Sequence, residues 1–486
     1  MTTRRRFLTG AAAAFGGAAF GLPRFAHASL AIGSEPCPYK ILEIFLNAGF
    51  SHRETLWMRA AGMEDSFAAP SDLGAIDASL ADAEPTGFAV GLEEVWLGPC
   101  VAPLAAAGLL PRVRLVALGH GLDVHEVAQD YALTGVAPGR PGYSSLGARI
   151  STRWGGGDLP ASYVIGGSSS DAVRRPALEV GELGSQNRPL LIPMSGNALK
   201  QRLNRGDRAV ADSLLGMHRD VYADRLEHPS FGRVRSKTFD VYDHAVSSIF
   251  QSPELLALLQ GAPDFAAIGG DYPNEVGPSS VRVGTYLLAN GARHACVLSP
   301  GLPDGRDTHN NSGDTFSDWG QHSQRHTGHL WAVFQALVDA INDGELDLDN
   351  TLVCINTEFG RYPRSDVIGS NHHTEGYAAL LLGGPVASPG LVGDIDYGLH
   401  SQGRATGGFV SGSHTPTDLM AALTLAAGID PFGDELFDIG DTSFGSGFDT
   451  ESALDLLREE LLGAEPGDTC DVLTGETDDS IDDVTL

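Results

Sequence analysis

Short apolar segments that alternate with helical segments place the strongest constraint on the fold of this chain. The apolar segments consist of residues that suit strands buried on both faces, and stretches with helical periodicity separate them. This pattern predicts an α/β fold in which a mostly parallel sheet is flanked by helices. The predicted strands are Ile41–Leu46, Val113–Leu118, Ser162–Ile165, His294–Leu298, Leu352–Ile355 and Ala378–Leu382.

Two helices stand out in the second half of the chain. One is predicted from about Thr327 to Asn342, before Gly344, because its apolar residues recur at a spacing of three or four. A last helix is predicted near residues 417–427, with Thr417 and Asp418 as its cap and Gly428 at its end.

The first 28 residues have the three parts of a secretory signal. Paired arginines precede Phe7 and Leu8, a Gly/Ala-rich run follows, and Ala26-His27-Ala28 is a cleavage site of small residues. The arginine pair indicates twin-arginine export to the periplasm or the cell exterior. A membrane helix is the alternative, but the apolar run is too short to cross the hydrocarbon layer. We therefore expect no membrane insertion.

The charge of the chain excludes some partners. The formal net charge is −30, and removal of the four arginines of residues 1–28 leaves −34. Such a surface repels nucleic acid and anionic lipid. The only lysines are Lys40, Lys200 and Lys237. Adaptation to salt and a GC-rich genome both explain this composition, and the sequence does not separate them.

We expect one α/β domain over residues 29–464, with an inserted helical region at about 167–278 and a disordered acidic tail over 465–486. The aspartates of the tail lack the spacing of a calcium loop. Cys296 and Cys354 are predicted to be buried in strands, whereas Cys37, Cys100 and Cys470 lie in more polar segments that could supply one disulfide.

Polar side chains gather where the predicted strands end. In open α/β sheets, ligands bind beyond the carboxyl ends of the strands, so these groups would converge on one edge of a parallel sheet. A single histidine at such a place is usually a surface or hydrogen-bonded residue. Recurrence in successive units favours a functional cleft, with zinc or manganese on the imidazoles and carboxylates and an anionic substrate oxygen on Arg361. The groups include Asn47, Ser51, His120, Asp123, His125, Asp307, His309, Glu358, His372 and His373.

Five segments, taken in order, resemble the DUF1501 proteins, exported bacterial proteins of unknown function. The strand leading into Glu358-Phe359-Gly360-Arg361 resembles a motif of that family, and the other segments agree in order and spacing. The resemblance covers nearly the whole mature chain. Its segments are Ile44–His52, His125–Gly135, Leu287–His309, Leu352–Arg361 and Thr417–Asp430.

The DUF1501 family is similar to the alkaline phosphatase and sulfatase superfamily, so the resemblance implies a fold of that kind and a metal-dependent site. It implies Asp307, His309, His372 and His373 as ligands of a divalent ion (Zn, Mn or Ca). It also implies Glu358 as a ligand or base, Ser51 and His125 as catalytic groups, and Arg361 on the anion.

The chain departs from the superfamily pattern at three positions, so one ion, or none, is expected instead of two. Phe359 stands where the superfamily has a ligand histidine, and Asn47 stands where it has an acidic ligand. Val124 stands where DUF1501 proteins commonly have serine, and Ser51 and Thr134 are hydroxyls in the vicinity.

Two hypotheses follow from these motifs. The first is an exported hydrolase of phosphate or sulfate esters, whose substrate is an anionic small molecule or a glycan or lipid ester. The second is a binding or assembly protein that has lost its nucleophile and part of its metal site. Fold alone does not decide between them.

Overall fold

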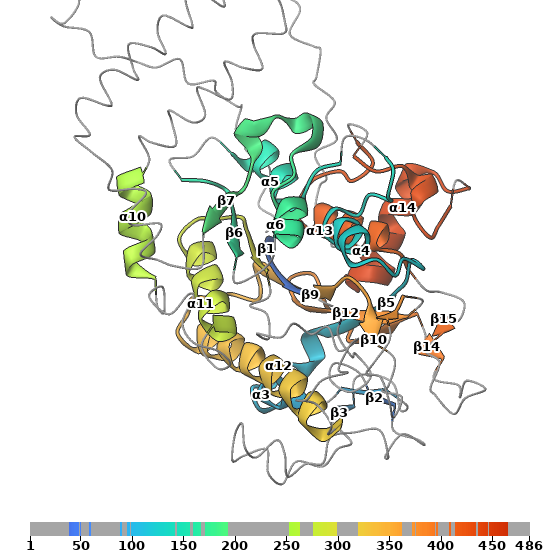
Figure 1. Ribbon diagram of the computed structural model, residues 1–486, viewed down its shortest axis with the longest axis horizontal. Coiled ribbons are helices and arrows are strands. Elements are labelled where there is room, and N and C mark those ends of the chain that lie inside the picture. The colour runs from blue at the N-terminus through green and yellow to red at the C-terminus, as the bar shows by residue number, and fades with distance from the viewer. Residues whose placement is uncertain are drawn as a thin grey trace, which may run out of the picture. The chain divides into compact units, whose positions relative to one another are not determined.

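The described part of the computed structural model centres on one eight-stranded sheet (Figure 1).

 The residues that the structure describes are 38–47, 49, 58–59, 88–89, 95–97, 99–140, 143–155, 159–166, 171–192, 252–262, 276–298, 319–361, 372–374, 376–393, 395–396, 408–409, 414–433, 436–445 and 447–464.

The eight strands of the main sheet have the order β13-β5-β12-β9-β1-β8-β6-β7. All neighbouring pairs are parallel except those of β12, which runs antiparallel to both β5 and β9. The fold is therefore α/β with a mixed, mostly parallel sheet, as the apolar segments predict. The strands are β1 (Lys40–Leu46), β5 (Val113–Leu118), β6 (Ser162–Gly166), β7 (Leu190–Ile192), β8 (His294–Leu298), β9 (Thr351–Thr357), β12 (Tyr377–Gly383) and β13 (Gly390–Val392).

Helices cover both faces of this sheet (Figure 1). One face packs against α3 (Ala102–Ala106), α11 (Val276–Ala289) and α12 (Trp319–Asn342) in a large apolar core. The other face packs mainly against α5 (Leu146–Trp154) and α13 (Pro416–Ala426). Burial on both faces explains why the central strands are continuous apolar runs. The remaining helices are α4 (His125–Thr134), α6 (Asp171–Ala177), α10 (Ser252–Gly261) and α14 (Thr450–Leu456), which the π-helical turn η11 (Leu457–Leu462) follows.

Three small sheets accompany the main one. They are β2 (Met58–Arg59), β4 (Val95–Leu97) and β3 (Phe88–Ala89) in that order, the pair β10 (Gly360–Arg361) and β11 (His372–His373), and the pair β14 (Ile395–Asp396) and β15 (Gly408–Phe409). The β10–β11 pair matters for the site, because it joins the segment after β9 to the segment before β12.

The predictions for the two helices need three corrections. The helix expected near 417–427 begins at Pro416, and its N-cap is Thr415 instead of Thr417. Thr415 and Asp418 form a reciprocal capping box, which satisfies two backbone donors at the helix start. It is also not the last helix, since α14 follows it. The helix expected to begin near Thr327 begins at Trp319.

The cysteine predictions have different outcomes. Cys296 and Cys354 are fully buried in β8 and β9, as predicted. Cys100 is fully buried in the apolar core, so the prediction of polar surroundings is wrong for this residue. Cys37 and Cys470 lie outside the described residues.

Parts of the predicted domain organisation also lie outside the described residues, namely the signal, the acidic tail and most of the inserted region. Within that region, β7 pairs with β6 at the edge of the main sheet. Among the described helices, none combines the length and the apolar character needed to span a membrane.

Candidate functional site

The candidate site lies at the edge of the sheet where β5 and β9 end. Because β12 is antiparallel to its neighbours, the segment before it reaches the same edge as the segments after β5 and β9. Glu358 follows β9, His125 begins α4, and His372 lies in β11. The sheet thus brings together side chains that are more than 200 residues apart in the chain.

Glu358 is the centre of the site. Its side chain is fully buried, and its Oε1 atom lies 3.0 Å from His125 Nδ1 and accepts a hydrogen bond from Gln129 Nε2 at 3.2 Å. Its Oε2 atom accepts a hydrogen bond from Thr357 Oγ1 at 3.2 Å. Burial alone would raise the pKa of the Glu358 carboxyl. The hydrogen bond and charge of His125, with the hydrogen bond of Gln129, outweigh burial, and the pKa lies below its ordinary value.

The ionised carboxylate determines which nitrogen of His125 carries a proton. A carboxylate only accepts hydrogen bonds, so Nδ1 carries a proton and is the donor. The His125 side chain is 24% exposed, whereas Glu358 is fully buried. His125 therefore reaches the surface and Glu358 does not, although the His125 Nε2 atom is itself buried.

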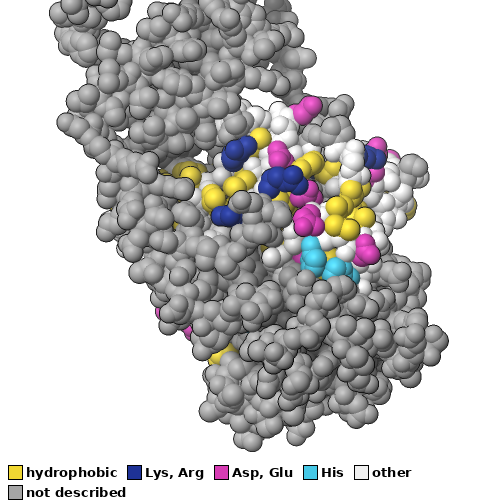
Figure 2. Space-filling model, in the orientation of Figure 1, with side chains coloured by type: hydrophobic (Ala, Val, Ile, Leu, Met, Phe, Trp, Pro, Cys, Tyr) yellow, Lys and Arg dark blue, Asp and Glu magenta, His cyan; other side chains and the backbone are white. Residues whose placement is uncertain are grey.

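His372 lies next to His125 and, like it, donates a hydrogen bond from its Nδ1 atom. The ring centroids are 4.6 Å apart, and His372 Nδ1 donates to the backbone carbonyl of Asp123 at 2.7 Å. Phe359 is fully buried and stacks on His372, with 4.2 Å between the ring centroids. Figure 2 shows histidine side chains side by side on the described surface, with acidic side chains close to them.

A further histidine supports the backbone of the site. His120 Nε2 donates to the Glu358 carbonyl oxygen at 2.6 Å, and His120 Nδ1 accepts from the Leu122 amide at 2.9 Å. Burial lowers the pKa of His120, against the raising effect of Glu358. A neutral ring is the form that this pair of hydrogen bonds requires.

The structure brings together some of the predicted site residues. His125, Glu358 and His372 meet, and Arg361 pairs with His372 while Gly360 pairs with His373 in the β10–β11 ribbon. Ser51, Asp307 and His309 lie outside the described residues. Thr134 ends α4, whereas His125 begins it, and the Thr134 hydroxyl donates to the Asp130 carbonyl.

Gln129 is the residue that the motifs did not single out. It is 4% exposed, and its Nε2 atom donates to Asn47 Oδ1 at 2.6 Å as well as to Glu358. The available signal was its spacing: Gln129 lies four residues after His125, on the same face of a helix.

The residues partly fit a metal ion. A metal-binding histidine usually donates its other ring N–H to a carbonyl or carboxylate, as His372 and His125 both do. Within the described ranges, no group of three or more His, Cys, Asp or Glu side chains could hold an ion. A complete ligand set would therefore need predicted ligands that lie outside those ranges.

Comparisons with known proteins give a family and a distant structural likeness. No curated protein matches the sequence. The chain is similar to the crystal structure of "Ps i-CgsB in complex with k-i-k-neocarrahexaose", with 9% identity and a TM-score of 0.35 over 81% of this chain and 72% of the other. A likeness at this level says nothing about function. The profile described as "Protein of unknown function (DUF1501)" matches residues 113–446, which is most of the chain, and the chain therefore belongs to the DUF1501 family.

Proposed function

We propose that this protein is an exported hydrolase of phosphate or sulfate esters in which His125 is the general acid and base. The observation that carries the proposal is the pairing of His125 Nδ1 with the fully buried carboxylate of Glu358 at 3.0 Å. A buried carboxylate that orients an imidazole through one of its two nitrogens is the arrangement of many hydrolytic sites.

Each residue of the site would have a separate task. His125 Nε2 would take a proton from the attacking water or hydroxyl and return it to the leaving alcohol. Glu358 would hold the ring and stabilise its protonated form, while Gln129 fixes the carboxylate. Arg361 would bind an anionic oxygen of the substrate.

The proposed ion site uses His372 and His373 together with Asp307 and His309. Zinc, manganese or calcium there would polarise the ester and neutralise charge that develops in the transition state. His372 suits this task because the Asp123 carbonyl holds its Nδ1–H, which presents Nε2 as the ligand atom.

A second candidate function is a binding or assembly role without catalysis. Val124 favours it, because this residue occupies the N-cap of α4 beside His125 with 52% of its surface exposed. A valine cannot act as a nucleophile there. Under either proposal, the protein acts in the periplasm or outside the cell.

The test combines metal analysis with hydrolysis assays on the mature protein. Wild type is assayed on aryl phosphate and aryl sulfate with Zn, Mn or Ca added. We expect His125→Ala to lower kcat by about a hundredfold or more, which is the usual size of general acid and base catalysis. His372→Ala should lose bound metal. Glu126→Gln is the matched control, because Glu126 is exposed on the same helix next to His125.

The two candidates give different results. A wild-type protein that contains no metal and hydrolyses neither ester under any of these conditions would favour the binding role. Hydrolysis that persists unchanged in His125→Ala would show that another residue is the base.

A further inference from the structure

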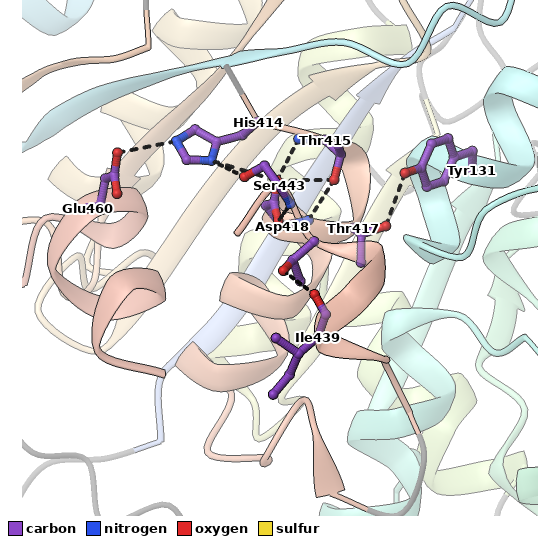
Figure 3. Close-up of polar contacts among 9 residues, drawn as sticks. Tyr131, His414, Thr415, Thr417, Asp418, Ile439, Ser443 and Glu460 are labelled. Atoms are coloured by element: carbon purple, nitrogen blue, oxygen red, sulfur yellow. Dashed lines mark hydrogen bonds and ion pairs between the residues drawn. The ribbon is translucent and has the colours of Figure 1, made fainter. Parts of the chain in front are cut away.

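A serine, a histidine and two carboxylates meet around the start of α13 (Figure 3). His414 Nδ1 lies 3.1 Å from Ser443 Oγ and 3.7 Å from Asp418 Oδ2. On the other side of the ring, Nε2 lies 3.6 Å from Glu460 Oε1. None of these residues belongs to the site around Glu358.

The exposure of the group suits a nucleophile with a buried base. The His414 side chain is 4% exposed and Asp418 is fully buried, whereas Glu460 is 42% exposed. Ser443 is exposed. An outside molecule can therefore approach the serine, while the histidine behind it is shielded from water.

Backbone contacts hold each member in place. His414 pairs with Leu118 at the end of β5, and Asp418 belongs to the capping box of α13. The Ser443 amide donates to Asp418 Oδ1 at 2.9 Å. Arg114 Nε donates to the Glu460 carbonyl at 2.9 Å, which fixes η11 against the sheet. Such preorganisation is what a catalytic group needs.

We propose that Ser443 is the nucleophile of a second hydrolytic site, which acts on uncharged carboxylic esters with His414 as its base and Glu460 and Asp418 as the groups that orient the base. A nucleophile within hydrogen-bond reach of a base, with the base oriented by a third group, is the general signature of such sites.

The reaction balances with water as the co-reactant. Ser443 Oγ forms a bond to the carbonyl carbon as its proton passes to His414 Nδ1, and the alcohol leaves with that proton as its bond to carbon breaks. Water then attacks the acyl-serine, gives a proton to His414, and releases the acid as Ser443 regains its hydrogen. The two carboxylates stabilise the protonated imidazole between these steps.

The surroundings point to an uncharged substrate with an apolar part. Phe444 follows Ser443, and its ring lies 6.2 Å from that of Phe448, which is 44% exposed. Residues on either side of Ser443, namely Ile439, Asp441 and Thr450, line a pocket of about 700 Å³, although Ser443 itself does not line it. Pockets of this size hold small organic ligands. The nearby carboxylates disfavour an anionic ester.

The experiment uses a fluorophosphonate probe, which labels activated serines, and p-nitrophenyl acetate as a substrate. The mature wild-type protein is labelled and its peptides are mapped by mass spectrometry. We expect the label on Ser443, its loss in Ser443→Ala, and labelling at least tenfold slower in His414→Gln. Ser452→Ala is the matched control, because Ser452 is a partly exposed serine of α14 outside the proposed site.

The outcomes separate this site from the proposed ester hydrolase. Labelling of Ser443 should be unchanged in His125→Ala. Glu460→Gln, a change at a partly exposed position, should slow labelling several-fold while the protein stays folded by circular dichroism. Absence of label from Ser443 in wild type, or an unchanged rate in both His414→Gln and Glu460→Gln, would overturn the proposal.

Discussion

At the scale of single residues, Glu358 shows how a fully buried carboxylate keeps its charge. Burial disfavours the charged form, but His125, Gln129 and Thr357 direct three donors at its two oxygens. Removing one partner of such a buried pair usually costs more than the pair contributes, because the remaining group is left uncompensated.

The lowered pKa of Glu358 predicts a loss of stability in acid. A carboxyl whose pKa is lower in the folded state stabilises the fold above its unfolded pKa, about 4.3, and this contribution is lost as the pH falls through the folded value. Urea unfolding between pH 3 and 7 should therefore show a flatter acid dependence in Glu358→Gln than in wild type. Asp349→Asn, at an 82% exposed carboxylate, is the control. An equal slope in Glu358→Gln and wild type would contradict the prediction.

Val124 gives a second prediction at this scale. It is the N-cap of α4, and its side chain makes no capping hydrogen bond. Val124→Ser should raise the free energy of unfolding by about 1 kcal/mol, because serine can accept from a backbone amide of the first turn. Chemical unfolding measures the change, and Val124→Ala should not reproduce it. A serine variant no more stable than the alanine variant would count against capping.

At the scale of elements, the contact between α5 and the sheet depends on a glycine. A Cβ atom at Gly147 would lie 2.4 Å from Ser162 Oγ and 2.9 Å from His294 Nδ1. Ser162 Oγ and His294 Nδ1 are themselves 2.7 Å apart. The helix can therefore approach β6 and β8 this closely only where the side chain is absent.

Gly147→Ala should consequently destabilise the protein. Alanine normally stabilises a helix by about 1 kcal/mol relative to glycine, so without these contacts the substitution would stabilise the protein. Because the added methyl group overpacks this contact, Gly147→Ala should instead lower the free energy of unfolding by about 1–3 kcal/mol. Thermal unfolding should show the loss, with Gly447→Ala as the control, since a Cβ at Gly447 meets nothing within 4 Å. Stabilisation by Gly147→Ala would show that α5 can move away.

At the scale of the whole molecule, the negative net charge is the dominant electrostatic feature. A formal net charge of −30 produces repulsion between acidic side chains in the folded state. Salt shortens the range of this repulsion from about 30 Å at 0.01 M to about 3 Å at 1 M.

Stability should therefore rise with salt. The unfolding temperature should increase between low NaCl and 1 M NaCl, and a non-ionic osmolyte at equal osmolality should give a smaller increase. A large increase of the unfolding temperature with NaCl would favour adaptation to salt as the reason for the acidic composition. An unfolding temperature that falls or stays constant as NaCl rises would refute the role of repulsion.

The sequence by itself determined the class of the fold and six strands of the main sheet, but not the two edge strands β7 and β13. Apolar runs such as Val113–Leu118 and His294–Leu298 match the observed strands in full, because burial on both faces is encoded in consecutive residues. The capping box of Thr415 and Asp418 is also encoded in neighbouring residues, although the N-cap is Thr415 and not the predicted Thr417.

Only the tertiary structure decided which polar groups meet. The reversed direction of β12 and the contact of Gln129 with Glu358 depend on the strand order and on how α4 packs, and neither is encoded in neighbouring residues. The same holds for Ser443, whose partners His414, Asp418 and Glu460 come from separate segments. Local patterns select elements, whereas contacts between distant residues follow from the packing of the whole core.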